Sequence, residues 1–140
     1  MLDDNMPEGY IHEPSTSAFI NHIGKVFHRK WTDVNGEAVV SVAIRVQEHH
    51  VNTWGLAHGS FMAAMAEIGG SGGAYEPGGP AIVSIEQSMQ FIGAPKLGEL
   101  LEVHGRIVKR TRSLVFTQAR AESDGKVVFT TTAIHKVIGA

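Results

Sequence analysis

The sequence predicts an α+β fold in which an antiparallel six-stranded sheet wraps around one central helix. The first supporting observation is a stretch at residues 59–75 that is apolar on nearly every face, which is typical of a buried helix. The second is a set of six strand-like segments, two before this helix and four after it. The third is the length of 140 residues with 43% hydrophobic residues, which fits one domain with a single core.

The N-terminal region carries little hydrophobic patterning. Residues 1–14 are polar and contain two prolines, so we expect a loosely held polar tail there and a single domain over residues 15–140. Ser15 and Thr16 are candidate N-caps, because a serine or threonine hydroxyl can accept a backbone N–H from the first turn of a helix. We therefore expect a short helix that ends at His22.

Turn residues separate the expected strands. Asn35 and Gly36 readily adopt the positive φ angles of a tight hairpin turn, which would join the two strands before the central helix. Asp124 and Gly125 mark the turn before the last strand. Because such turns connect successive strands, the sheet is predicted to be antiparallel. The expected strands are residues 25–31, 37–46, 81–92, 100–109, 114–123 and 126–138.

Glu67 is the one charged residue in the predicted central helix. Burial of an ionised carboxylate without a partner costs several kcal/mol, so this residue requires an explanation. Either it forms a structural ion pair at an interface, or it belongs to a catalytic site, where perturbed carboxylates commonly act as general bases. The glycine-rich residues 69–73 and the Pro-Gly-Gly-Pro segment at 77–80 limit the helix to about four turns.

Composition excludes several kinds of partner. The formal charge of -2 and the pI near 6.4 give no electrostatic basis for binding nucleic acid or an anionic membrane surface, so the expected partner is a small molecule. The apolar runs are shorter than the ~20 residues of a membrane span, and the first residues are acidic, unlike a signal peptide. We expect a cytoplasmic protein. The chain has no cysteine, so it has neither disulfides nor a cysteine nucleophile.

No metal site is predicted, although the chain contains eight histidines. His49 and His50 are adjacent, and on an extended backbone their side chains would point in opposite directions. The chain has no His-Glu-x-x-His pair or comparable ligand spacing. The glycine-rich residues 69–73 are not a phosphate loop either, because they end a helix and no Lys-Ser/Thr pair follows them.

Four elements of the sequence occur in a recognisable order. They are Asn52, the pair His58 and Gly59 six residues later, the acid Glu67 nine residues after the histidine, and a strand-turn segment at residues 84–98. In this order and spacing the chain resembles the hotdog-fold acyl-CoA thioesterases, specifically the phenylacetate-degradation type and the Arthrobacter-type 4-hydroxybenzoyl-CoA thioesterases.

The resemblance spans roughly residues 20–138. It departs from the family pattern at two positions. Ser60 replaces the second glycine of the frequent His-Gly-Gly, and Glu67 stands where many members of the phenylacetate-degradation type carry aspartate.

The resemblance implies a thioesterase site, and physical chemistry suggests the role of each residue. The free backbone N–H of Gly59, at the positive end of the helix dipole, would receive the developing oxyanion. Glu67 would either activate a water as general base or attack the thioester carbon as nucleophile. Asn52 would hold the loop or the thioester carbonyl, and His58 would orient the turn. Ser71, one turn beyond Glu67, would position the water.

The spacing along the helix predicts a site shared between subunits. Gly59 and Glu67 are eight residues apart, which corresponds to about 12 Å along one helix. Two groups that act on one carbonyl carbon need to be closer, so we expect Gly59 of one subunit to face Glu67 of another, as the resemblance also implies. A second copy would in addition cover the sheet edge and the helix flanks. We expect a homodimer, assembled into a homotetramer.

The substrate expected from the resemblance is a small or medium acyl-CoA or an aryl-CoA. Coenzyme A would be part of this substrate, and no separate cofactor is expected. Two alternatives from other classes are a non-catalytic acyl-CoA-binding hotdog protein and a hotdog enoyl-CoA hydratase or dehydratase. Candidate substrate-binding residues are Ser84 near the site, Trp54 and Phe61 for the acyl group, and the cations Lys96, Lys109, Arg110 and Arg112 for the coenzyme A phosphates.

Overall fold

The computed structural model describes residues 5–139. Residues 1–4 of the expected tail lie outside this range. Within the described range, none of the helices is long and apolar enough to cross a membrane. The elements are β1 (Ile11–His12), α1 (Ala18–Ile23), β2 (Phe27–Thr32), β3 (Ala38–Arg45), the 3-10 helix η1 (Glu48–His50), α2 (Gly59–Ala74), β4 (Ile82–Phe91), β5 (Leu100–Arg110), β6 (Leu114–Ser123) and β7 (Lys126–Val137).

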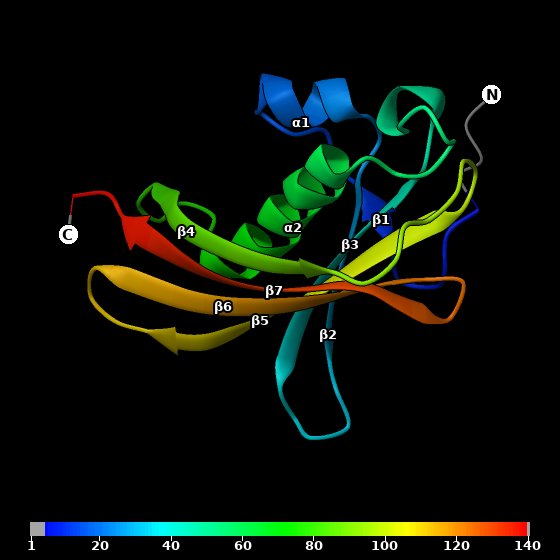
Figure 1. Cartoon of the computed structure of the whole chain (residues 1–140). Helices are drawn as coiled ribbons and strands as arrows, with labels where there is room; N and C mark the ends of the chain where they lie inside the picture. The colour runs from blue at the N-terminus through cyan, green and yellow to red at the C-terminus, as the bar shows by residue number, and fades with distance from the viewer. Residues whose placement is uncertain (1–4, 140) are drawn as a thin grey trace.

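All neighbouring strands are antiparallel, and the sheet order is β1-β2-β3-β5-β6-β7-β4. Helix α2 lies along one face of the twisted sheet, as Figure 1 shows. The predicted hotdog architecture, an antiparallel sheet wrapped around one central helix, is therefore confirmed. The sheet has seven strands instead of six, because Ile11 and His12, within the expected tail, pair with His28 and Phe27 of β2.

The two predicted hairpin turns differ in geometry. Asp124 and Gly125 both have positive φ, at 51° and 71°, so they form the tight two-residue turn between β6 and β7. The connection between β2 and β3 is longer and spans residues 33–37. There the carboxylate of Asp33 accepts the backbone N–H groups of Asn35 and Glu37, and Gly36 supplies a positive φ. The hairpin predicted at Asn35 and Gly36 is therefore present, but of these two residues Gly36 alone has a positive φ, because Asp33 organises a loop wider than a two-residue turn.

Helix α1 begins later than the sequence suggested. Its N-cap is Ser17, whose hydroxyl accepts the N–H of Ile20 at 3.3 Å. Ser15 instead accepts the N–H of Ser17 at 3.0 Å, in a turn that precedes the helix. The prediction of a cap at Ser15 or Thr16 was wrong by one or two residues, because the Ser15 hydroxyl forms the preceding turn and the Ser17 hydroxyl caps the helix.

Small residues bring α2 close to the sheet. A Cβ placed on Gly105 of β5 would lie 2.5 Å from the carbonyl oxygen of Gly69, and a Cβ on Gly69 would lie 2.6 Å from Cγ1 of Val103. Either contact is too short, so these glycines permit the close approach of helix and strand. The glycines expected to weaken α2 near its C-terminal end lie inside the helix, where packing against the sheet outweighs their low helix propensity.

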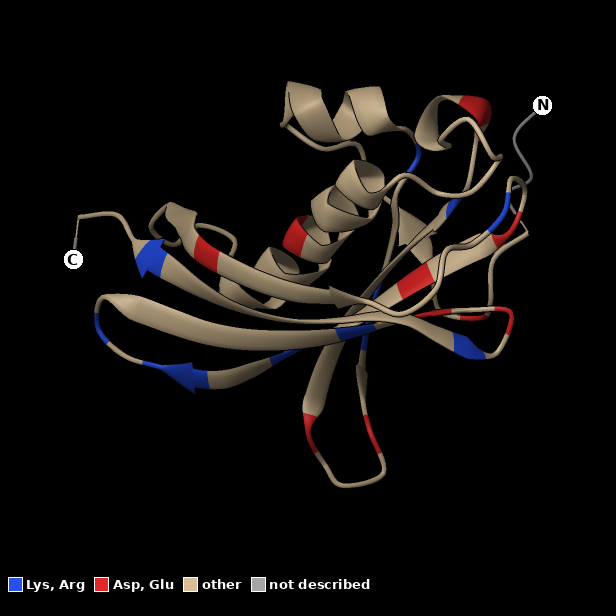
Figure 2. Ribbon diagram, in the orientation of Figure 1, with Lys and Arg blue, Asp and Glu red and all other residues tan. Residues whose placement is uncertain are grey.

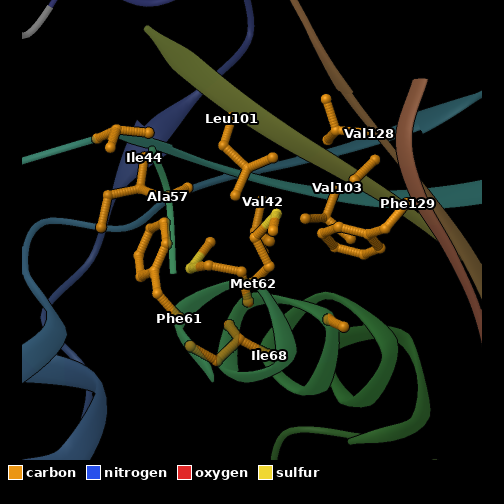
Figure 3. Packing of buried hydrophobic residues seen from close by; sticks show 14 of the residues in the cluster. Val42, Ile44, Ala57, Phe61, Met62, Ile68, Leu101, Val103, Val128 and Phe129 are labelled. Atoms are coloured by element: carbon orange, nitrogen blue, oxygen red, sulfur yellow. The ribbon is translucent and has the colours of Figure 1, made fainter. Parts of the chain in front are cut away.

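The main core lies between α2 and the sheet. Figure 3 shows Met62 and Ile68 of α2 beside side chains of β3, β5 and β7, among them Leu101 and Phe129. Leu101 and Phe129 are fully buried, and Met62 is nearly so. This packing fixes the rotation of α2, so that its opposite flank, which carries Glu67, faces β4.

Candidate functional site

The first turn of α2 is built by His58. His58 is the N-cap, and its ring Nδ1 accepts the backbone N–H of Ser60 at 3.0 Å. Its carbonyl oxygen accepts the N–H of Met62, and its own N–H donates to the carbonyl of His50 at 2.8 Å. The ring of His58 therefore satisfies one of the amide groups that a helix start leaves without an intrahelical partner.

Gly59 presents a free amide next to this cap. Its backbone N–H has no partner among the described residues. A Cβ on Gly59 would meet the ring of Phe91 at 3.7 Å, an ordinary contact, so the helix start is open enough for a small group to approach. An unpaired N–H at the positive end of a helix dipole can stabilise an oxyanion.

Asn52 organises the loop that leads into α2. Its side-chain oxygen accepts the backbone N–H groups of Trp54 at 2.9 Å and Leu56 at 3.2 Å. Its backbone N–H donates to the carbonyl of Leu56 at 2.8 Å. The oxygen of the carboxamide is thus used inside the loop, whereas its Nδ2 has no partner among the described residues. Asn52 can hold the loop and still donate a hydrogen bond to a ligand.

Glu67 lies in the middle of α2, half-buried, on a helix with no other charged residue. Figure 2 shows this single acidic band on the helix, beside the edge strand β4. The Ser84 hydroxyl of β4 donates a hydrogen bond to Glu67 Oε1 over 2.5 Å. The carboxylate therefore has a fixed side-chain partner, which is a hydroxyl and not a cation. The salt bridges seen within residues 5–139 do not include Glu67.

Two further residues, not predicted from the sequence, extend the hydrogen bond between Ser84 and Glu67 into a chain. The ring of His135, on β7, places Nδ1 3.0 Å from Ser84 Oγ and Nε2 2.9 Å from Thr117 Oγ1 of β6. Both residues are buried, with exposed fractions of 1% for His135 and 2% for Thr117. Burial lowers the pKa of the His135 imidazole below its ordinary value, while the charge of Glu67 acts in the opposite direction. His135 is therefore neutral at pH 7.

A partial signal for these residues exists in the sequence. Inward-facing residues alternate along β7, and His135 falls in the inward phase of that pattern, as Thr117 does in β6. The alternation indicates that both side chains face α2. It does not indicate which helical residue they meet, because that depends on strand order and register.

Ser71 lies on α2 one turn beyond Glu67, as its spacing predicted. Its hydroxyl donates to the carbonyl of Ile68 at 3.4 Å, within the helix. The hydroxyl that contacts Glu67 belongs to Ser84. A role for Ser71 in positioning a water stays a prediction.

The predicted phosphate-binding cations lie at two ends of the molecule. Lys96 pairs with Leu56 beside the loop that precedes α2. Lys109, Arg110 and Arg112 lie at the hairpin between β5 and β6, where Figure 2 shows basic segments together. Arg110 donates to the carbonyl of Ala74 at 3.0 Å, at the other end of α2, which is about 24 Å long. One subunit does not bring these cations together.

A cavity of about 350 Å³ lies beside the first turn of α2. Side chains of α1, η1 and α2 form its walls, including Phe19, Ile23, His50 and Phe61. Phe61 is buried and stacks on His50 with ring centroids 3.9 Å apart. Trp54, in contrast, is 81% exposed and does not line this cavity. A larger hollow of about 560 Å³ on the sheet, which includes Arg120 and Gln118, contains none of the predicted site residues.

Gly59 and Glu67 lie on one uninterrupted helix. Their eight-residue separation therefore corresponds to a rise of about 12 Å within one subunit. Within residues 5–139, no three histidine, aspartate or glutamate side chains are grouped to hold a metal ion.

Comparison with known proteins identifies relatives of this chain. Residues 55–130 match the model of the Thioesterase superfamily. The chain is 30% identical over 133 residues to a Pseudomonas aeruginosa protein named "Putative esterase PA0474", a match that covers 93% of this chain and 96% of that protein.

Solved structures share the fold. A mutant of the phenylacetic acid degradation protein PaaI from Thermus thermophilus matches with a TM-score of 0.74 and 20% identity, over 87% of this chain and 100% of that one. A hypothetical thioesterase from Streptococcus pneumoniae, solved with coenzyme A, matches with a TM-score of 0.70 and 23% identity, over 81% of this chain and 89% of that one.

Proposed function

Because the chain belongs to the thioesterase superfamily and is a thioester hydrolase, we propose that it cleaves a small or medium acyl-CoA or aryl-CoA to the free acid and coenzyme A. Glu67 acts as general base on a water or as nucleophile on the thioester carbon. The N–H of Gly59 stabilises the oxyanion, and Nδ2 of Asn52 donates to the same carbonyl group.

One observation carries this proposal: the lone carboxylate of α2 is held by a hydroxyl, and the amide at the start of the same helix is unpaired. A structural carboxylate would be expected to face a cation, whereas Glu67 has only Ser84 on one of its two oxygens. The second oxygen is available to a water or a thioester. An unpaired helix-start amide is the complementary group, since it stabilises the negative charge that develops on the carbonyl oxygen.

The neighbouring cavity supports the choice of acyl group. Its volume of about 350 Å³ and its aromatic and aliphatic walls suit a small or medium apolar group or an aromatic ring. It lies next to the first turn of α2, where the thioester carbonyl would bind. The coenzyme A complex of the Streptococcus pneumoniae relative supports coenzyme A as the leaving group here.

The active unit in this proposal is a homodimer, assembled further into a homotetramer. Gly59 and Glu67 of one subunit are about 12 Å apart along the helix, which is too far for joint action on one carbon, so the partner supplies one of them. The edge strand β4 supports a second copy. It is ten residues long, has a neighbour on one side within the described sheet, and exposes Val83, Ile85 and Phe91. A partner at this edge would also place opposite ends of the two helices near each other, so that Lys96 and Arg112 of different subunits can serve one coenzyme A.

The histidine next to Ser84 and the histidine at the start of α2 do not favour the hydratase alternative. Acid–base chemistry on an enoyl group requires a histidine that reaches the substrate. His135 is buried behind Ser84, and His58 uses its Nδ1 as a helix cap. A non-catalytic binding protein would retain acyl-CoA binding without turnover.

The test is thiol release from a panel of acetyl, hexanoyl, benzoyl and phenylacetyl-CoA by the wild type and by Glu67→Gln. We expect turnover of at least one substrate by the wild type and loss of turnover in the variant. Binding of all four without thiol release would support the non-catalytic alternative and refute the hydrolase. Hydration of crotonyl-CoA without thiol release would support the hydratase.

A second experiment tests the shared site. Gly59→Val and Glu67→Gln chains are mixed under conditions of verified subunit exchange. A mixed dimer retains one intact site, so activity should recover to as much as a quarter of the wild-type value, since statistical exchange makes about half of the dimers mixed. Absence of any recovery would show that both groups act within one subunit.

A further inference from the structure

The side chains behind Glu67 form a continuous hydrogen-bonded chain. It runs from Glu67 on α2 to Ser84 on β4, then to His135 on β7 and Thr117 on β6, over 2.5, 3.0 and 2.9 Å. Four elements contribute one residue each. The last two residues are fully enclosed, so they cannot contact a substrate.

The chemistry of the four groups determines the direction of these hydrogen bonds. An ionised carboxylate only accepts, so the single proton of Ser84 points to Glu67. Ser84 Oγ must then accept from His135, which places the ring proton on Nδ1. Nε2 of the neutral ring carries a lone pair and accepts from the Thr117 hydroxyl. Every donor in the chain therefore points toward Glu67.

The surroundings of His135 support a neutral ring. Burial lowers its pKa, and Glu67 is the one charged group that acts on it within the described residues. Ser84 faces it from β4 and Thr117 from β6, and neither is charged at neutral pH. On the α2 side, a Cβ placed on Gly70 would lie 4.0 Å from Nε2, so the helix backbone closes the site there.

We propose that His135 and Thr117 are positioning residues for the hydrolysis proposed above, on which this inference rests. Glu67, through Ser84, favours the tautomer of His135 that carries the proton on Nδ1, and the Thr117 hydroxyl stabilises this tautomer by donating to Nε2. The Nδ1–H in turn orients the hydroxyl of Ser84 toward Oε1 of Glu67. The hydroxyl then holds one carboxylate oxygen in a fixed place, so that the other oxygen is directed at the water or the thioester carbon. Without His135, the Ser84 hydroxyl has several rotamers and Glu67 is less ordered.

The kinetic test compares His135→Leu with His135→Asn. Leucine fills the space without a donor, whereas the amide N–H of asparagine can replace Nδ1–H. We expect His135→Leu to lower kcat by about 10-fold with an unchanged KM, and His135→Asn to stay within about 3-fold of the wild type. In a Ser84→Ala background, His135→Leu should have no further effect, because its action passes through the Ser84 hydroxyl. Equal losses in the leucine and asparagine variants, or additive losses with Ser84→Ala, would overturn the proposal.

Thr117→Val provides a test that preserves the core, because valine matches threonine in shape. Thr131 on β7 is its matched control, since it is also buried and its hydroxyl bonds to the backbone carbonyl of Ser88 outside the chain of four. We expect kcat to fall about 3-fold in Thr117→Val and to stay unchanged in Thr131→Val. Equal effects of the two substitutions would show a general cost of hydroxyl removal and would refute the positioning role.

Nuclear magnetic resonance provides a readout that does not depend on turnover. The long-range 15N–1H spectrum distinguishes the two neutral tautomers, and the signals of His135 are identified by their loss in His135→Asn. We expect the Nδ1–H tautomer in the wild type and a mixture in Thr117→Val. The Nε2–H tautomer in the wild type would overturn the inference even if the enzyme is active. A wild type without thioesterase activity would instead refute the proposed function, whatever the tautomer.

Discussion

The two halves of the proposed site are built in different ways. At the start of α2, side chains bond to backbone groups close in sequence, as His58 does with Ser60 and Asn52 does with Leu56. In the middle of α2, Glu67 and Ser84 are 17 residues apart, and Ser84 and His135 are 51 apart. The first half is a local loop-and-cap structure that exposes backbone amides. The second is a side-chain network that exists only when the sheet has formed.

This difference indicates how each half responds to substitution. The local half depends on loop conformation and on the absence of a side chain at Gly59, so its chemistry tolerates changes elsewhere in the sheet. The network half depends on individual side-chain donors and acceptors, and no neighbouring group can replace them. Substitutions in each half test this contrast.

The largest effect is expected in the network half. Glu67→Gln keeps the shape of the side chain and its hydrogen bond with Ser84, but removes the carboxylate that acts as base or nucleophile. Loss of such a group lowers kcat by about 10³-fold. Stopped-flow and steady-state measurement of thiol release would determine this value. Glu13→Gln is the control, because Glu13 is exposed and lies between β1 and α1, away from α2 and the edge strand β4, and it should retain full activity. A Glu67→Gln enzyme with more than a tenth of the wild-type kcat would contradict the assignment.

The next effect concerns the amide of Gly59. Gly59→Ala keeps the N–H but adds a methyl group where the thioester carbonyl approaches, and a displacement of about 1 Å can cost on the order of 10²-fold in kcat/KM. The new Cβ would make only an ordinary contact with Phe91, so the fold should be retained. Gly73→Ala is the control in the same helix, with its nearest contact at 3.6 Å to Val40. Full activity in both variants would show that close approach at Gly59 is not required.

Substitution of Asn52 tests whether its side chain both stabilises the loop and binds the ligand. Asn52→Asp retains an oxygen for the N–H groups of Trp54 and Leu56 and loses the Nδ2 donor. We expect an unchanged melting temperature and a roughly 10-fold lower kcat, since a single neutral hydrogen bond contributes about 0.5–1.5 kcal/mol. Asn52→Ala should lower both. Differential scanning calorimetry and kinetics on the same samples separate the two roles. If Asn52→Asp is fully active, Asn52 serves the loop alone.

The smallest effect is a pH dependence of stability that involves both halves. Burial lowers the pKa of His50, near the start of α2, and of His135, and also of His28 and His104 on the sheet. In the unfolded chain these histidines titrate near 6.5, so below that pH the unfolded state binds more protons than the folded state. The free energy of unfolding should be constant above about pH 7 and fall as the pH decreases through 6.5.

Urea unfolding between pH 5.0 and 8.0 measures this dependence. The slope below pH 6.5 should decrease in His135→Asn, because one of the four titrating groups is removed. An unfolding free energy that is constant or rises as the pH falls from 6.5 to 5.5 would contradict buried neutral histidines in both halves.

The local half of the site and most of the fold follow from the sequence. The central helix, its lone acid and the six main strands were predicted because hydrophobic periodicity and turn residues depend on neighbours a few positions away. Asn52, His58 and Gly59 belong to the same category, since the side-chain hydrogen bonds of Asn52 and His58 span two to four residues and Gly59 follows the His58 cap directly. The errors in this category were small. Asp33 formed a wider loop than expected around Gly36, and Ser17 capped α1 in place of Ser15.

The tertiary structure alone decided the other half. The order β6-β7-β4 places Ser84 opposite His135, and His135 opposite Val115. The close contact of Gly69 with β5 fixes the position of α2 along the sheet, and so the position at which Glu67 meets Ser84. Helical spacing indicated Ser71 as a residue that positions water one turn beyond Glu67, and it did not indicate that the hydroxyl in contact with Glu67 comes from Ser84 on β4. Sequence patterns determine which side of an element is buried. Strand order, register and helix packing determine which buried groups meet, because those depend on the whole core.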